Sequence, residues 1–114
     1  MKYALLIYED ESLYGPDKAG PRVQEMVAKH MAFTQDLGAK RIGGAGLKAT
    51  ATATTVHTKG GKKTVHDGPF AEAREQLGGL YVVDVASLDE AIEIAKRIPL
   101  AQDGAIEVRP VLGP

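Results

Sequence analysis

The fold is decided by two stretches, KYALLIYE at Lys2–Glu9 and GGLYVVDV at Gly78–Val85. Both carry apolar side chains at successive positions, so neither face of the stretch is suited to water. Strands of this composition are typically buried from both sides, as the central strands of a sheet are. We therefore expect these two stretches to be the central strands of one sheet.

Two helices are expected on the chain. Proline suits a first helical turn and glycine a helix end, so the first helix should begin near Pro21 and end at Gly38. At about 100° per residue its apolar face carries His30 near its centre, which should point at the sheet. The second helix opens with the capping box SLDE at 87–90 and stops at Pro99.

A β-hairpin is predicted around Gly60-Gly61, a pair typical of a type I′ turn. Its strands are Thr55–Lys59 and Lys62–Asp67. The turn sets the register, so that Val56 faces Val65 and His57 faces Thr64. By strand phase Asp67 shares the face of the two valines, and we expect it to point toward the apolar interior.

Further strands are expected at Lys40–Lys48, which is rich in glycine and therefore bulged or closely approached, and at Ala105–Val111. The order β-α-β, hairpin, β-α-β predicts an α+β fold, a ferredoxin-like sandwich with an inserted β-hairpin, in a single domain spanning 1–114. Helices can cover only one face of such a sheet. Because the central strands are apolar on both faces, a homodimer is expected to cover the other.

Composition excludes several classes of function. The net charge is −1 and there is no cysteine, so a basic nucleic-acid surface, disulfides and cysteine-ligated metals are not expected. No apolar run is long enough to span a bilayer, which predicts no membrane partner and a cytoplasmic location. No nucleotide or phosphate-binding motif is present, so we expect no cofactor.

The string DGPF at 67–70, followed by AEAREQLGG at 71–79, carries a family resemblance. Together with the opening MKYALLIYED and the closing IEVRPV, it resembles the YCII-related family in its DGPF-domain branch. The resemblance implies a dimeric α/β barrel. Most members are uncharacterised, some lie beside genes for sigma factors, and a His–Asp pair in a cleft has been proposed as catalytic. His30 matches the family's histidine, and Asp67 is the acid we select by motif and strand phase.

The candidate catalytic residues are thus His30 and Asp67, since a carboxylate beside an imidazole tunes it toward a general base. Two alternatives stay open: His30 as a buried histidine with one satisfied partner, and Asp67 as a turn residue. Candidate substrate-binding residues are Tyr8, Glu75, Tyr81 and Arg109. No metal site is predicted, because His57 and His66 supply too few ligands.

Three functions are compatible with these patterns. The first is an enzyme that binds a small polar or anionic organic molecule in a cleft between helices and sheet and transfers a proton through His30. The second is a non-catalytic ligand-binding or accessory dimer linked to sigma-factor regulation. The third is a structural dimer whose polar cleft has no role.

Overall fold

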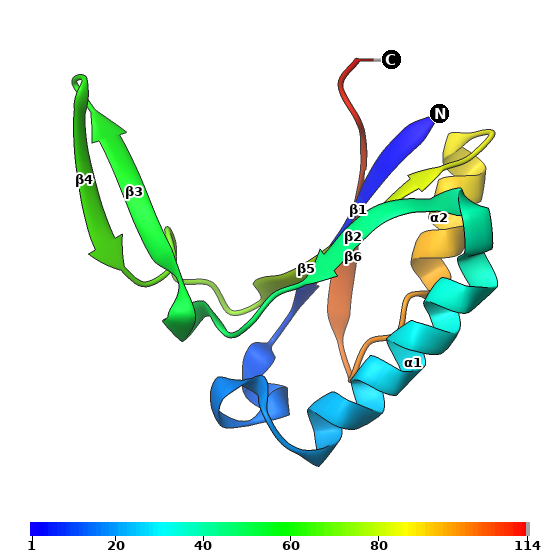
Figure 1. Ribbon diagram of the computed structural model, residues 1–114, viewed down its shortest axis with the longest axis horizontal. Helices are drawn as coiled ribbons and strands as arrows, with labels where there is room; N and C mark the ends of the chain where they lie inside the picture. The colour runs from blue at the N-terminus through cyan, green and yellow to red at the C-terminus, as the bar shows by residue number, and fades with distance from the viewer. Residues whose placement is uncertain (114) are drawn as a thin grey trace.

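The chain adopts a mixed α+β fold with two antiparallel sheets and two α-helices, and the computed structural model describes residues 1–113 (Figure 1). Pro114, the last residue of the predicted domain, lies outside this range. The elements are β1 (Lys2–Glu9), α1 (Pro21–Leu37), β2 (Arg41–Gly46), β3 (Thr54–Lys59), β4 (Lys62–Asp67), β5 (Gln76–Asp84), α2 (Leu88–Arg97) and β6 (Gly104–Pro110). Short 3-10 turns are η1 (Glu11–Tyr14), η2 (Pro16–Lys18), η3 (Gly38–Lys40) and η4 (Thr50–Thr52).

The main sheet has four strands in the order β2-β5-β1-β6. Its neighbouring strands are antiparallel, and Leu5 of β1 lies between Tyr81 of β5 and Val108 of β6. The two stretches that are apolar on both faces are therefore the central strands, as predicted. Strand β5 begins two residues earlier than expected, at Gln76, because its pairing with β1 continues to Glu9.

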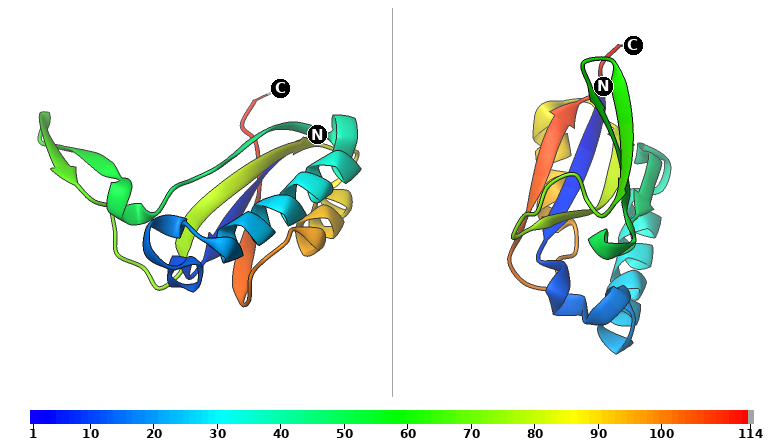
Figure 2. Two further views of the ribbon diagram at one scale, coloured as in Figure 1. Left: turned by 60° about the horizontal axis from the view of Figure 1, so that its bottom comes forward. Right: turned by 90° about the vertical axis from the view of Figure 1, so that its left-hand side faces the viewer.

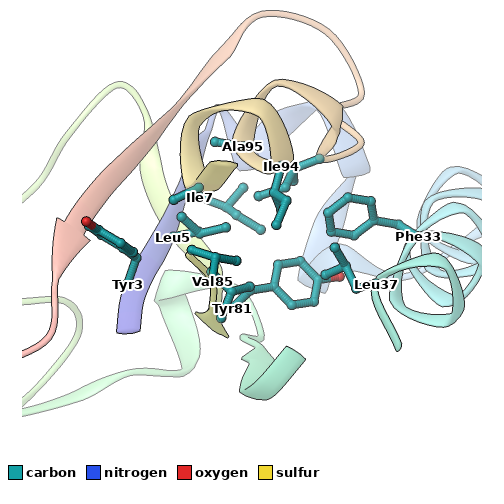
Figure 3. Packing of buried hydrophobic residues seen from close by; sticks show 12 residues of the cluster. Tyr3, Leu5, Ile7, Phe33, Leu37, Tyr81, Val85, Ile94 and Ala95 are labelled. Atoms are coloured by element: carbon teal, nitrogen blue, oxygen red, sulfur yellow. The ribbon is translucent and has the colours of Figure 1, made fainter. Parts of the chain in front are cut away.

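Both helices pack on one face of this sheet (Figures 1 and 2). Every second residue of β1 is buried beneath them, whereas Ala4, Leu6 and Tyr8 point to the opposite face and are partly exposed. Figure 3 shows how side chains of the sheet and both helices meet in the core: Tyr3, Leu5, Ile7, Phe33, Leu37, Tyr81, Val83, Val85, Ala91, Ile94, Ala95 and Ile98. Within residues 1–113, no helix covers the opposite face of the sheet (Figure 2).

Both helices end where the sequence predicts. Gly20 and Gly38 flank α1 with positive φ, and Pro21 occupies its first turn. At α2 the side chain of Ser87 accepts a hydrogen bond from the backbone N–H of Glu90, which in turn accepts one from Ala86 through its carboxylate. The Ser87 half of the predicted capping box therefore forms, whereas the carboxylate of Glu90 accepts from the N–H of Ala86 and not from that of Ser87.

Strand β2 shows the predicted bulge and close backbone approach. Its pairing with β5 shifts register between Arg41 and Gly43. A Cβ at Gly44 would lie 2.7 Å from the carbonyl oxygen of Leu80 and 3.3 Å from Nη2 of Arg41. Only glycine fits at this position, where φ is 150°. The strand is shorter than the predicted Lys40–Lys48 at both ends, because Lys40 belongs to η3 and the strand ends at Gly46.

The predicted hairpin forms with the expected register, Val56 opposite Val65 and His57 opposite Thr64. It makes a separate two-stranded sheet that projects from the rest of the molecule (Figures 1 and 2). The radius of gyration is 15.6 Å, against about 13 Å for a compact domain of this length.

The expected interior position of Asp67 is therefore wrong. Every residue of β4 is exposed, and Val56 and Val65 are 60% and 67% exposed to solvent. The face that the valines share with Asp67 does not meet the helices. Strand phase predicted correctly which side chains lie together, but it contains no information about where the whole hairpin is placed.

Candidate functional site

A cleft of about 640 Å³ lies between α1 and the strands β5 and β2. One wall is apolar and partly open to solvent, with Val27, Met31 and Leu47 exposed by 52%, 61% and 42%. A volume of this size suits a small organic ligand. Its polar lining comes from side chains that are far apart in sequence: Glu9, Tyr14, Lys18, His30, Thr34, Gln35, Arg41, Lys48 and Tyr81.

His30 and Tyr81 form the central contact of the cleft. Nδ1 of His30 lies 2.7 Å from the hydroxyl oxygen of Tyr81, within hydrogen-bond distance. The rings of His30 and Tyr81 are stacked, with centroids 5.9 Å apart. Phe33 and Tyr81 pack in a T-shaped arrangement, with centroids 5.3 Å apart. Tyr81 is itself 7% exposed, so packing holds its hydroxyl in place (Figure 3).

Glu9 supplies a buried carboxylate at the end of β1, with 8% of its surface exposed. The hydroxyl of Tyr14 donates to both carboxylate oxygens, at 2.9 and 2.8 Å, and the backbone N–H of Ala101 donates at 3.0 Å. Burial, reinforced by Glu9, raises the pKa of Tyr14 far above its usual value. Tyr14 therefore keeps its proton and remains a donor to Glu9.

Burial lowers the pKa of His30 below 6.5, whereas the charge of Glu9 and the backbone of Pro99 act in the opposite direction. A lowered pKa keeps the imidazole neutral at neutral pH, with one nitrogen able to accept a proton. In the tautomer with the proton on Nε2, Tyr81 donates its hydroxyl proton to Nδ1. The site thus combines a neutral base, a phenol and a carboxylate that stabilises the protonated imidazole.

Two of the cationic side chains that line the cleft lie near aromatic rings. The guanidinium of Arg41 lies over the ring of Tyr81, with Cζ 5.7 Å from the centroid. Its Nε is buried and has no hydrogen-bond partner among the described residues. Nζ of Lys18 donates to the carbonyl of Leu47 at 3.0 Å and lies 5.7 Å from the ring centroid of Tyr14.

Of the residues predicted from sequence, His30 and Tyr81 come together in this cleft. Asp67 does not join them within one chain, because it lies on the projecting hairpin. Glu75 is exposed in the segment that follows β4, Arg109 is exposed and paired with Glu107, and Tyr8 is on the opposite face of the main sheet. The cleft of the single chain is not lined by these four residues.

Sequence reasoning missed Glu9, Arg41 and Tyr14. Strand phase could have identified Glu9, because it shares the alternation of Tyr3, Leu5 and Ile7 and so must lie beneath the helices. No sequence pattern identified Arg41 as a cleft residue, since the bulge that orients it depends on how β2 pairs with β5.

The hairpin histidines lie together as predicted: His57 and His66 are stacked, with ring centroids 4.9 Å apart. Within residues 1–113, metal-ligating side chains form no group of three or more that could hold an ion. In the same part of the chain, no helix is both long enough and apolar enough to cross a membrane.

Comparison with known proteins gives two matches. The model of the YCII-related domain matches residues 1–113. The chain is also 39% identical over 116 residues to a protein of Rhizobium meliloti (strain 1021) named uncharacterized protein R00369, with 97% of this chain and 92% of that protein covered.

Proposed function

We propose that the cleft binds a small organic anion and that His30 and Tyr81 move a proton to or from it. The chain belongs to the YCII-related domain family. The observation that carries this proposal is the 2.7 Å contact between Nδ1 of His30 and the hydroxyl of Tyr81 in a cleft open to solvent. A neutral base hydrogen-bonded to a phenol is a competent general acid–base pair.

The proposed step is a proton relay of the kind that isomerases and lyases use. A proton leaves the bound molecule for the hydroxyl oxygen of Tyr81 as the hydroxyl proton of Tyr81 moves to Nδ1 of His30. The result is a substrate with one more negative charge, a neutral tyrosine and an imidazolium, whose charge Glu9 stabilises. Asp67 has no place in this relay within one chain, because it lies on the exposed hairpin.

The test is solvent exchange. The protein is incubated in D₂O with a panel of small keto acids and hydroxy acids, and loss of carbon-bound protons is followed by NMR. We expect exchange with at least one compound, and a loss of roughly 10²-fold or more in Tyr81→Phe and His30→Gln, as for other general acid–base groups. His66→Gln, which changes an exposed histidine of β4, is the matched control and should keep the full rate.

Deuterium exchange that persists in both Tyr81→Phe and His30→Gln would refute the proton relay. Exchange with none of the compounds would favour the second candidate, a ligand-binding or accessory protein linked to sigma-factor regulation. One observation supports that candidate: the carboxylate of Glu9 already accepts from two donors of the protein itself, the hydroxyl of Tyr14 and the backbone N–H of Ala101. A carboxylate that is already hydrogen-bonded within the protein fits a structural or ligand-binding role as well as a catalytic one.

A homodimer of the ferredoxin-like, dimeric barrel type is part of the proposal. The strand order β2-β5-β1-β6 and the two helices on one face support it. So does the uncovered face, where Leu6 and Tyr8 alternate with the buried residues of β1. Sedimentation should show a dimer that Leu6→Glu disrupts and that Leu88→Glu, which adds the same charge to an exposed position on α2, leaves intact. A monomeric wild-type protein would refute it.

A further inference from the structure

We infer that the cleft holds an anion-binding subsite built on Arg41, and that its ligand is a small carboxylate with an apolar body. The inference rests on the proposed function, since it names the class of molecule that the His30–Tyr81 pair would meet. It begins from Arg41 Nε, a buried donor that has no hydrogen-bond partner among the described residues. A buried donor of this kind costs stability unless a partner arrives.

Arg41 differs in this respect from other arginines of the chain. Arg97 pairs with Asp36 at 3.0 Å, and Arg109 pairs with Glu107. Arg22 donates to the carbonyl oxygen of Leu13 at 3.2 Å, and Arg74 is exposed. Arg41 makes no ion pair with any carboxylate in the described residues, although it is partly buried beside a cleft. A guanidinium offers donors in a planar fork that matches a carboxylate, so an anionic ligand supplies the missing partner.

The position of Arg41 is prepared by its surroundings. The bulge between Arg41 and Gly43 turns the chain at this point. Gly44 leaves open the space next to Nη2, where a Cβ would lie at 3.3 Å. The guanidinium of Arg41 lies over the ring of Tyr81, with Cζ 5.7 Å from the ring centroid. Because His30 stacks on the same ring, a carboxylate bound at Arg41 would lie next to the proton-transfer pair.

The charge and polarity of the lining agree with this ligand. Lys18, Arg41 and Lys48 line the cleft, and the carboxylate there, Glu9, already receives hydrogen bonds from Tyr14 and Ala101. Beyond the cations the wall is apolar and includes a run of side chains from α1: Val23, Met26, Val27 and Met31. Such a wall favours a hydrocarbon or aromatic body and disfavours a sugar or a second charge.

The test compares 2-naphthoate with 2-naphthamide, which have nearly the same shape and differ in charge. Binding is measured by calorimetry and by ¹H–¹⁵N chemical shifts at pH 7.5. We expect the wild-type protein to bind naphthoate about tenfold more tightly or better, as a charged hydrogen bond predicts. Arg41→Met should remove this preference and leave naphthamide binding within about twofold, since the hydrophobic wall that binds the ring system is kept.

Two further variants sharpen the result. Arg74→Met, which removes an exposed arginine, should keep the preference for naphthoate. Arg41→Lys retains the charge without the fork and should give an intermediate preference, so it tests the subsite even if Arg41→Met does not fold. Equal binding of both compounds by the wild-type protein, or a preference that survives in Arg41→Met, would overturn the inference.

The subsite and the proton relay can fail separately. A preference for naphthoate without any deuterium exchange would support the subsite and reject the relay. Exchange that depends on His30 and Tyr81, together with equal binding of the two probes, would do the reverse.

Discussion

Replacing Glu9 by glutamine tests the cleft most directly, because the change keeps shape and removes charge. The carboxylate accepts hydrogen bonds from Tyr14 at 2.9 and 2.8 Å and from the N–H of Ala101 at 3.0 Å. One oxygen of Glu9, Oε2, accepts from both neighbours, and a glutamine amide oxygen has two lone pairs, so it can keep both contacts if it takes that place. Both hydrogen bonds then lose the negative charge of their acceptor in a buried position.

The expected cost follows from these contacts. A hydrogen bond to a charged group contributes about 1.5–3 kcal/mol and a neutral one about 0.5–1.5 kcal/mol. Because two hydrogen bonds become neutral, we expect Glu9→Gln to lower the free energy of unfolding by about 2–3 kcal/mol. For a chain of this length that corresponds to a fall in Tm of about 10 °C. The charge of Glu9 also raises the pKa of His30. In the variant the pKa of His30 should therefore fall further below its ordinary value.

Two measurements check the prediction: thermal unfolding followed by circular dichroism, and an NMR pH titration of the His30 ring protons. Glu107→Gln is the control, because that glutamate is paired with Arg109 at a partly exposed position and should matter little. The reasoning is refuted if Glu9→Gln melts within about 2 °C of the control, or if the pKa of His30 rises.

Three further outcomes are expected. The pKa of His30 is lowered in the native state, so the unfolded chain binds the proton at a higher pH than the folded chain does. The free energy of unfolding should therefore fall as pH drops below about 6.5, by at most about 1.4 kcal/mol per pH unit. Urea unfolding of His30→Gln should lack this pH dependence. Gly44→Ala places a Cβ 2.7 Å from the carbonyl oxygen of Leu80 and should cost about 1–3 kcal/mol in a melting experiment, whereas Gly46→Ala, which has open space, should cost much less. Asp67→Asn, on the exposed hairpin, should leave the NMR titration of His30 unchanged; a shift as large as that of Glu9→Gln would return Asp67 to the site.

The sequence alone determined the local structure and the pairing of the sheet. Apolar residues at successive positions identified β1 and β5 as the central strands, because runs of this kind are typical of strands inside a sheet. Pro21, Gly38 and the capping box at Ser87 placed the helix ends through backbone conformation and hydrogen bonding. The turn at Gly60-Gly61 set the hairpin register, since φ is positive at both glycines.

Which side chains meet in the cleft depends on how the elements pack together. Helix phase placed His30 toward the sheet, but its partner is Tyr81 and not Asp67, because the hairpin turns away from the helices as a unit. Arg41 reaches the cleft through a bulge and the space left by Gly44. Periodicity constrains neighbours within one strand or helix, whereas a cleft depends on how separate elements are packed, and that information is not contained in any single segment.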